Sequence, residues 1–298
     1  MRSARRGALF MNPASGSADR ERAEQIAAAA SAAGLDALAL EKDLDVQAEV
    51  RQRIDRGQRL FVAAGGDGTV HALVQPLVGT EGELAVLPVG TWNHFARDIH
   101  LSLDWREALE VALTGQIRQI DVGRVNDRFF INNLSLGFYP ELVQHREKYR
   151  KLGKWRAYFH ALSAAMKKFP HVALAVESPH RFESIRTHVF MVSVNAYNLE
   201  QPGIMAPRES LDGGFLSVYW LPDLPKHQFV LSVGRYLRGK MGADGAIRSV
   251  RTTNLRVQSA RASMSVGLDG ELHDLATPMV ISVVRKALNV RTPRNTAA

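Results

Sequence analysis

The chain has 298 residues, no cysteine, 46% hydrophobic residues, and 38 Lys and Arg against 30 Asp and Glu, for a net charge of +8. The absence of cysteine excludes disulfides, thiol nucleophiles and thiolate metal sites, and this length favours two domains over one. The sequence contains no apolar run of the roughly 18 residues that a membrane span needs, and the N-terminus lacks the apolar core of a signal peptide, so we expect a cytoplasmic protein. The excess positive charge favours phosphates or anionic lipid as neighbours.

Up to about residue 120, apolar strand-like runs alternate with helix-like segments. The predicted strands are 7–13, 35–41, 59–65 and 83–90, and the predicted helices are 17–34, 45–57, 68–78 and 104–115. Strands that are apolar throughout and separated by helices predict a parallel sheet covered on both faces. The pattern therefore predicts an α/β nucleotide-binding domain over residues 1–122.

Beyond residue 120 one strand-like run follows another, most of them joined by short connections. Asn126-Asp127 lies between two extended arms, which is typical of a hairpin. The later runs are 171–178, 187–196, 214–221, 254–260, 262–268 and 278–284. This pattern predicts a second, mainly β domain over residues 123–298, an antiparallel sandwich or open barrel.

A single basic, amphipathic helix is predicted near residues 150–169. Apolar side chains recur there at steps of three and four, which predicts one apolar stripe: Leu152, Trp155, Phe159, Leu162, Met166 and Phe169. Residues 143–170 also hold eight Lys or Arg and only one acid, Glu147. Two interpretations stay open: a helix packed on the β domain with solvated basic residues, or one that rests on anionic membrane beside the lipid entrance. Nucleic-acid binding is not expected, because no known motif accompanies the charge.

Three turns rich in glycine, hydroxyl and amide residues each follow a predicted strand. They are NPASG (12–16), GGDGT (65–69) and GTWN (90–93). Because the carboxyl ends of parallel strands meet at one edge of a sheet, and glycine leaves backbone N–H groups accessible, the turns predict a phosphate cradle. Neither a P-loop lysine motif nor GxGxxG is present. Asp67 in the second turn would repel phosphates unless a divalent cation bridged them, so we expect Mg²⁺ there.

In order along the chain, NPASG, GGDGTVHALV, PVGTWNHFARD and LDGE (268–271) resemble the diacylglycerol kinase catalytic-domain family, in particular bacterial lipid kinases related to sphingosine kinases. The resemblance covers nearly the whole chain. It implies an ATP-dependent, Mg²⁺-requiring kinase of lipid metabolism that phosphorylates a diacylglycerol-like hydroxyl and works at the inner membrane surface, with its active site in the cleft between the two domains. The implied nucleotide-binding residues are Asn12, Pro13, Ser15, Gly16, Gly65, Gly66, Asp67, Gly68, Thr69, Thr91 and Asn93.

The same resemblance implies the catalytic carboxylates. Asp269 matches the aspartate that takes the proton from the lipid hydroxyl in bacterial members, and Glu271 is its acidic companion. Asp67 competes for the role of base, as in the sphingosine kinases. Asp121 matches an aspartate at the domain junction. From the residues alone, Asp269 could be an ordinary Asp-Gly hairpin turn, and Asp121 could merely brace the junction or bind a metal.

The chain departs from the family pattern in two places. Gly213 stands where many bacterial members have the acid that holds a structural Mg²⁺, and Asp212 is the nearest substitute ligand. His94 replaces an acid in the third turn. Two other functions remain open: an NAD kinase, which shares GGDGT, and a non-catalytic relative that binds lipid or nucleotide. The oligomeric state is also open, with a homodimer among the alternatives.

Overall fold

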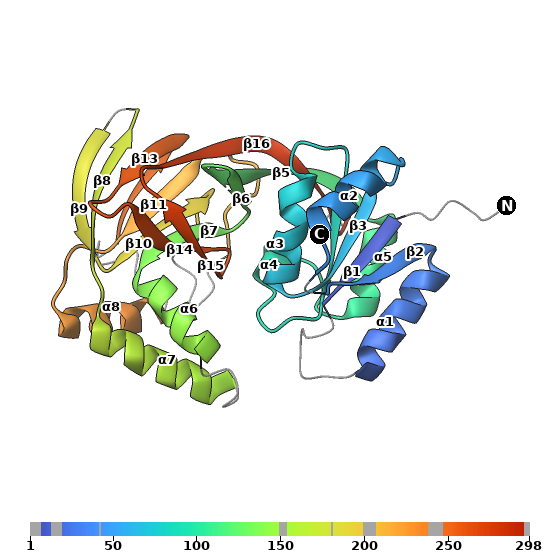
Figure 1. The fold of residues 1–298 in the computed structure, drawn as a ribbon, viewed down its shortest axis with the longest axis horizontal. Helices are drawn as coiled ribbons and strands as arrows, with labels where there is room; N and C mark the ends of the chain where they lie inside the picture. The colour runs from blue at the N-terminus through green and yellow to red at the C-terminus, as the bar shows by residue number, and fades with distance from the viewer. Residues whose placement is uncertain are drawn as a thin grey trace. The chain divides into compact units, whose positions relative to one another are not determined.

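The computed structural model describes residues 7–12, 20–41, 43–148, 154–179, 181–198, 207–237 and 247–294. The chain divides into two compact units (Figure 1). Unit 1 consists of Met1–Val122 and Arg285–Ala298, and unit 2 of Gly123–Val284. The sequence pattern assigns all of 123–298 to the second domain, whereas the last 14 residues belong to unit 1, because they extend the strand β16 (Met279–Thr292) beside β4 (Glu83–Pro88).

Unit 1 is built on a parallel sheet, as the sequence predicts. Its strand order is β2-β1-β3-β4-β16, and every neighbouring pair in this order is parallel. Besides β4 and the end of β16, the strands are β1 (Gly7–Met11), β2 (Leu35–Ala39) and β3 (Leu60–Gly65). Every residue of β3 is buried, which is expected of a central strand covered on both faces.

Helices separate the strands of unit 1, and capping aspartates begin two of them. The helices are α1 (Arg20–Ala32), α2 (Val46–Asp55), α3 (Asp67–Leu77), the short α4 (His94–Asp98) and α5 (Trp105–Thr114). Asp45 accepts from the N–H of Ala48 at 3.0 Å at the start of α2. Asp104 accepts from the first-turn N–H groups of α5, at 2.8 and 3.2 Å. These bonds satisfy donors that a helix start leaves without partners.

Unit 2 is an antiparallel sandwich, which confirms the predicted class. One sheet has the order β12-β11-β10-β7-β14-β15, and the other continues from β16 through β13 and β8 to β9. The first contains β7 (Asn133–Gly137), β10 (Val189–Val194), β11 (Leu216–Trp220), β12 (Arg248–Thr252), β14 (Ser263–Leu268) and β15 (Glu271–Ala276); the second contains β8 (Val172–Ser178), β9 (Arg181–Thr187) and β13 (Asn254–Gln258). Buried residues of both sheets, such as Phe190, Val218, Val257 and Ile281, form one core between them.

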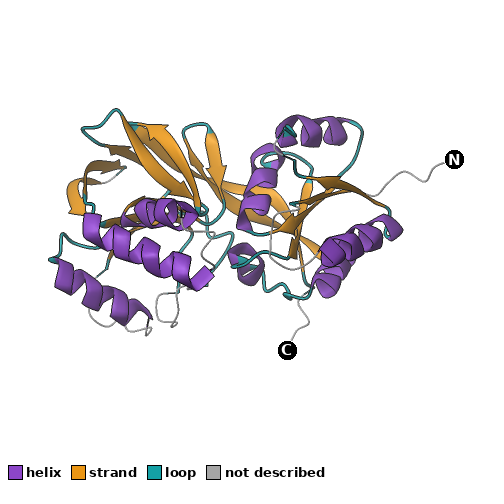
Figure 2. Cartoon of the chain, turned by 60° about the horizontal axis from the view of Figure 1, so that its bottom comes forward, coloured by secondary structure: helices purple, strands orange, loops and turns teal. Residues whose placement is uncertain are grey.

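Unit 2 contains three helices among its described residues, where the sequence predicts a single one. They are α6 (Phe138–Lys148), α7 (Lys154–Lys168) and α8 (Lys226–Leu237), and Figure 2 shows them together on one side of the strands. The predicted helix corresponds to α7. The pattern missed α8 because its central run, Phe229 to Val233, contains two β-branched valines and suits a strand as well as a helix.

Two strands cross from one unit to the other. They are β16 and β5 (Gln116–Val125), which pair with each other, and β5 also forms a hairpin with β6 (Arg128–Phe130) through the predicted Asn126-Asp127 turn. Lys286 adopts a left-handed φ of 50°, and its N–H donates to Asp121 Oδ1 at 2.9 Å. Asp121 is completely buried. Its carboxylate therefore stabilises an irregular residue of β16 near the point where that strand enters unit 1.

No helix in the described part of the chain is both long and apolar enough to cross a membrane.

Replacing Asp121 with Ala should lower the free energy of unfolding by about 2 to 3 kcal/mol, because the N–H of Lys286 would lose a charged acceptor. Urea denaturation followed by circular dichroism measures this difference. Glu110→Ala, at an exposed position of α5, is the control and should change stability by less than about 0.5 kcal/mol. Equal stabilities of the two variants would contradict the bracing role of Asp121.

Candidate active site

The predicted phosphate-binding turns lie at the switch point of the unit 1 sheet. The chain leaves β1 toward β2 on one side and leaves β3 toward β4 on the other. Such a point is where open α/β sheets bind ligands, at the carboxyl ends of the strands. Asn12 follows β1 directly, and its N–H donates to the carbonyl of Ala64 near the end of β3 at 3.3 Å. Pro13, Ser15 and Gly16, the rest of the first turn, lie outside the described residues.

The second and third turns touch each other through bare backbone. A Cβ built on Gly90 would lie 2.2 Å from Gly66 Cα and 2.7 Å from Gly66 N. No side-chain rotation relieves a clash between backbone atoms, so the contact requires glycine at residue 90. The two turns thus present backbone, rather than side chains, where the ends of β3 and β4 meet.

Asp67 is the first residue of α3, and its carboxylate connects α3 to the third turn. Its Oδ1 accepts from the N–H of Phe95, in the first turn of α4, at 3.2 Å. First-turn N–H groups have no acceptor within their own helix, and in α3 they include those of Gly68 and Thr69. A carboxylate and amide donors that have no acceptor within their own helix therefore lie side by side at the start of α3.

Asn93 organises the third turn through its side chain. It adopts a left-handed φ of 50° and is buried. Its Oδ1 accepts from the N–H of Gly90 at 3.1 Å, and its Nδ2 donates to the carbonyls of Pro88 and Gly90 at 3.1 and 3.0 Å. With all these bonds inside the turn, Asn93 shapes the backbone, whereas the exposed Thr91 can contact a ligand.

A cavity of about 330 Å³ lies within unit 1 beside the third turn. Its lining includes Pro88 and Val89, directly before Gly90, together with the starts of α1 and α5. None of the predicted site residues lines it, so it lies next to the glycine turns and is not formed by them.

In unit 2, Asp269 and Gly270 form the two-residue turn between β14 and β15. Both residues have positive φ, 50° and 90°, as a type I′ hairpin turn requires. The carboxylate of Asp269 is buried and accepts three backbone N–H groups. Oδ2 accepts from Ile131 at 2.9 Å, and Oδ1 accepts from Asn132 and Asn133 at 2.7 and 3.1 Å. Asp269 thus anchors residues 131–133, at the start of the neighbouring strand β7.

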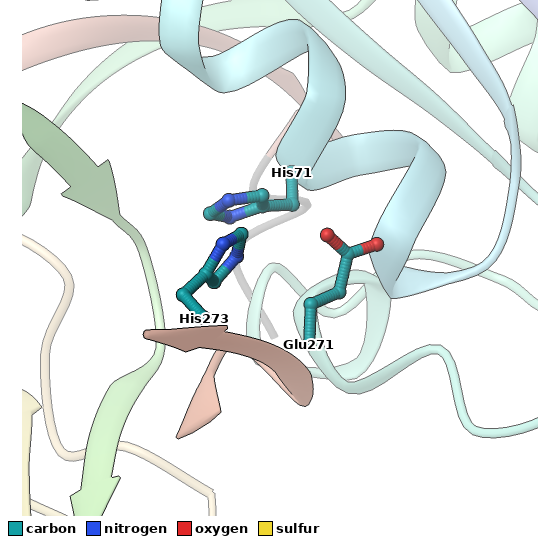
Figure 3. A group of neighbouring side chains, drawn as sticks. All are labelled: His71, Glu271 and His273. Carbon is teal, nitrogen blue, oxygen red and sulfur yellow. The ribbon is translucent and has the colours of Figure 1, made fainter. Parts of the chain in front are cut away.

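Other contacts hold this anchored segment from further sides. The guanidinium of Arg208 donates to the carbonyl of Ile131, and Asn133 Nδ2 donates to the hydroxyl of Tyr197 at 3.0 Å. The sequence analysis did not identify Arg208 or Tyr197, because neither belongs to a motif and both reach Asp269 only through this segment. Glu271 is exposed on β15, and Figure 3 shows it projecting from the same side of the strand as His273, while His71 projects from α3.

The two candidate metal ligands have other partners. Asp212 Oδ1 accepts from the hydroxyl of Ser210 at 2.7 Å, and the Asp212 N–H donates to the same hydroxyl. A Cβ on Gly213 would lie 2.8 Å from Asn195 Oδ1, so the acid common in relatives would need a local shift. Within the described part of the chain, neither Asp212 nor Asp121 belongs to a cluster of three or more carboxylate or imidazole groups.

Comparison with known proteins agrees with this geometry. Residues 6–125 match the family model described as the diacylglycerol kinase catalytic domain. A protein named probable lipid kinase YegS-like, from Pseudomonas aeruginosa, is 30% identical over 258 residues, which are 85% of this chain and 82% of that protein. The chain belongs to the diacylglycerol kinase catalytic-domain family.

A second curated relative and a solved structure are also similar to the chain. A diacylglycerol kinase of Bacillus subtilis is 27% identical over 245 residues, covering 80% of this chain and 79% of that protein. The crystal structure of a diacylglycerol kinase from Bacillus anthracis has the same fold, with a TM-score of 0.77, 22% identity and 99% of each chain covered.

Substitution of Asp269 should destabilise this family member according to how many acceptors are lost. Asp269→Asn keeps one acceptor oxygen and tolerates the left-handed φ, so we expect a loss of about 1 to 2 kcal/mol. Asp269→Ala leaves three N–H groups without an acceptor and should cost about 3 kcal/mol or more. Urea denaturation tests the order, with the exposed Asp274→Ala on β15 as control. An Ala variant as stable as the control would show that the three bonds contribute little.

Proposed function

We propose that the protein transfers the γ-phosphate of ATP to the hydroxyl of a diacylglycerol-like lipid. The observation that carries this proposal is the backbone contact of Gly66 with Gly90, which joins two phosphate-binding turns at the switch point of the sheet. Names of the relatives, lipid kinase and diacylglycerol kinase, support the lipid as substrate class. They favour it over the NAD kinase alternative, which shares GGDGT and the two-domain plan but is not expected to carry NPASG or GTWN.

The nucleotide would bind to the glycine turns of unit 1. Backbone N–H groups of residues 65–69, the start of α3 and the hydroxyl of Thr91 are suited to phosphate oxygens. Asn12 continues this surface from β1, and the role proposed for Pro13, Ser15 and Gly16 follows from the motif alone. Asn93 contributes by holding the third turn in shape rather than by direct contact.

Asp67 fits the role of a Mg²⁺ ligand. Its Oδ1 accepts from Phe95, whereas its Oδ2 has no hydrogen-bond partner among the described residues. A hard cation prefers such carboxylate oxygens, directly or through water. Mg²⁺, when bound, would neutralise phosphate charge as the P–O bond to the leaving ADP breaks. Asp121 is a weaker candidate because it is completely buried, and Asp212 because its carboxylate and its N–H both bond to the hydroxyl of Ser210.

We propose Asp269 as the acceptor of the lipid hydroxyl proton, released as the hydroxyl oxygen bonds to the γ-phosphorus. Its three N–H partners occupy three of the roughly four lone-pair positions of a carboxylate and hold it in one orientation. Glu271, exposed on the same hairpin, is the second carboxylate, and Asp67 remains the alternative base.

We expect the protein to act at a membrane surface. A lipid substrate implies contact with the cytoplasmic membrane surface and a role in phospholipid metabolism. The protein would bind there peripherally, and a homodimer is compatible with this. A catalytically inactive relative is the remaining alternative, for which Gly213 is the one sequence hint.

Incubation with γ-labelled ATP and Mg²⁺ should label diacylglycerol or a related lipid in mixed micelles, with NAD offered in a parallel reaction. Gly90→Ala should reduce labelling at least about a hundredfold, because the added Cβ separates the two turns. Gly57→Ala is the control: at a φ of +84° the substitution strains the backbone locally, but its Cβ would meet nothing within 4 Å.

Each other outcome of this assay has a distinct meaning. Label in NAD alone would identify a nucleotide kinase. ATP binding without any labelled lipid would favour the inactive relative. Equal activity of the Gly90 and Gly57 variants would show that the turn contact does not hold the nucleotide.

Asp67→Asn should remove the Mg²⁺ dependence of ATP binding while preserving the fold. The amide oxygen can still accept from Phe95, so only the charge is lost. Calorimetric titration with ATP, with and without Mg²⁺, should show affinities that differ about tenfold or more in the original protein and little in the variant. A variant that retains the full Mg²⁺ effect would exclude Asp67 as the ligand.

A further inference from the structure

Helix α7 turns large apolar side chains away from the protein. Phe159 is 73% exposed and Leu162 36% exposed, although the sequence pattern predicts them on one stripe with Met166 and Phe169. The contacts of α7 with the core are made by Ala161 and Ala165, both completely buried, and Met166 and Phe169 of the predicted stripe pack partly buried against the same cluster. Small residues let α7 approach its neighbours closely, which leaves Phe159 and Leu162 on the outside.

Helix α8 shows the same arrangement. Phe229 is buried in the cluster that α8 shares with α6 and α7, while Val230 and Leu231 are 51% and 60% exposed. Burial of one face is enough to hold a helix in place. Val230 and Leu231 lie on another face, so their apolar side chains do not contribute to the core. Contiguous exposed apolar side chains of this kind mark interaction sites.

Both helices belong to one layer of unit 2. Their buried residues meet in a single cluster that contains Phe138, Leu142, Ala161, Ala165, Leu221 and Phe229. Figures 1 and 2 show α7 and α8 on the same side of the unit 2 strands. Their exposed side chains therefore belong to one helical layer rather than to opposite faces of the unit.

The charge of these two helices has one sign. Neither the α7 sequence KWRAYFHALSAAMKK nor the α8 sequence KHQFVLSVGRYL contains an acid. Arg156, Lys167, Lys226 and Arg235 are exposed on them. Lys168 pairs with Glu141 of α6 at 2.8 Å, so its charge is partly balanced.

We propose that an anionic lipid bilayer binds to this α7/α8 surface, which consists of Phe159, Leu162, Val230, Leu231, Arg156 and Arg235. The apolar side chains enter the headgroup region while the basic side chains contact lipid phosphates, as in amphipathic helices at membranes. This inference deepens the proposed function, on which it rests for its choice of a bilayer as the partner. It assigns membrane contact to both α7 and α8, and to their apolar as well as their basic side chains, rather than to the basic residues of α7 alone.

A second copy of the chain fits the surface less well. A two-fold symmetric dimer through α7 and α8 would set the same basic side chains of both copies against each other, with no acid on either helix to balance them. An anionic bilayer supplies both the missing negative charge and an apolar layer. Charge complementarity therefore selects the bilayer.

The test is sedimentation of the full chain with vesicles of phosphatidylcholine containing about one third phosphatidylglycerol, without ATP. Phe159→Ser and Val230→Ser should each lower the binding constant about tenfold. Their controls are Phe182→Ser and Val280→Ser in the same unit, since these side chains are 69% and 52% exposed on strands. The controls should bind as the original protein does.

The charged part of the surface has its own pair of variants. Arg156→Gln combined with Arg235→Gln should weaken binding to the anionic vesicles and reduce its salt dependence, whereas Arg256→Gln on β13 should not. Vesicles of phosphatidylcholine alone should bind the original protein at least about tenfold more weakly.

Three results would overturn the proposal: no binding to anionic vesicles, equal loss in the surface and control variants, or a dimer in solution that Phe159→Ser dissociates. Because no nucleotide is present, failure of the kinase proposal would leave vesicle binding unchanged. Conversely, lipid labelling in micelles without vesicle binding would remove only the assignment of the surface.

Discussion

The candidate nucleotide site depends on one backbone contact, that of Gly66 with Gly90. Two parallel strands bring their carboxyl ends together, but their turns can touch only where no Cβ intervenes. Around this contact the other residues have defined tasks. Asn93 folds the third turn back on itself, and Asp67 connects the start of α3 to Phe95. Glycine at residues 66 and 90 thus allows the backbone donors of the two turns to lie close together. The hydrogen bonds of Asn93 and Asp67 stabilise this arrangement.

Three aspartates that the motifs single out share a structural task. Asp67, Asp121 and Asp269 each accept a backbone N–H from a distant part of the chain: Phe95, Lys286 and residues 131–133. A carboxylate is the strongest acceptor available to such donors. Residues that a motif presents as chemical groups are therefore also elements of the fold. Asp67 differs from the other two in that it is only half-buried, whereas Asp121 and Asp269 are buried, which makes Asp67 the best suited to a cation.

Most of the architecture follows from patterns in the sequence. Continuous apolar runs separated by amphipathic helices predict the parallel sheet, because strands that are buried on both faces are apolar throughout. Short strands joined by turns predict the sandwich, in which each sheet buries one face. The sequence does not predict that residues 285–298 belong to unit 1, because the residue pattern of a strand does not indicate which sheet the strand joins. The anchoring of residues 131–133 by Asp269 is equally hidden, because it joins segments about 137 positions apart.

Helical periodicity could not distinguish burial from exposure in α7. Residues at steps of three and four share a stripe, but the stripe faces the core only if the opposite face is polar and if large side chains fit. In α7 the neighbouring face carries Ala161 and Ala165, and close packing against α6 and Phe229 selects these small residues. Phe159 and Leu162 are then displaced to the rim of the contact and into solvent. Burial in the core therefore does not explain why residues 159 and 162 are apolar. Together with the basic residues beside them, these exposed apolar side chains are better explained by an interface with lipid.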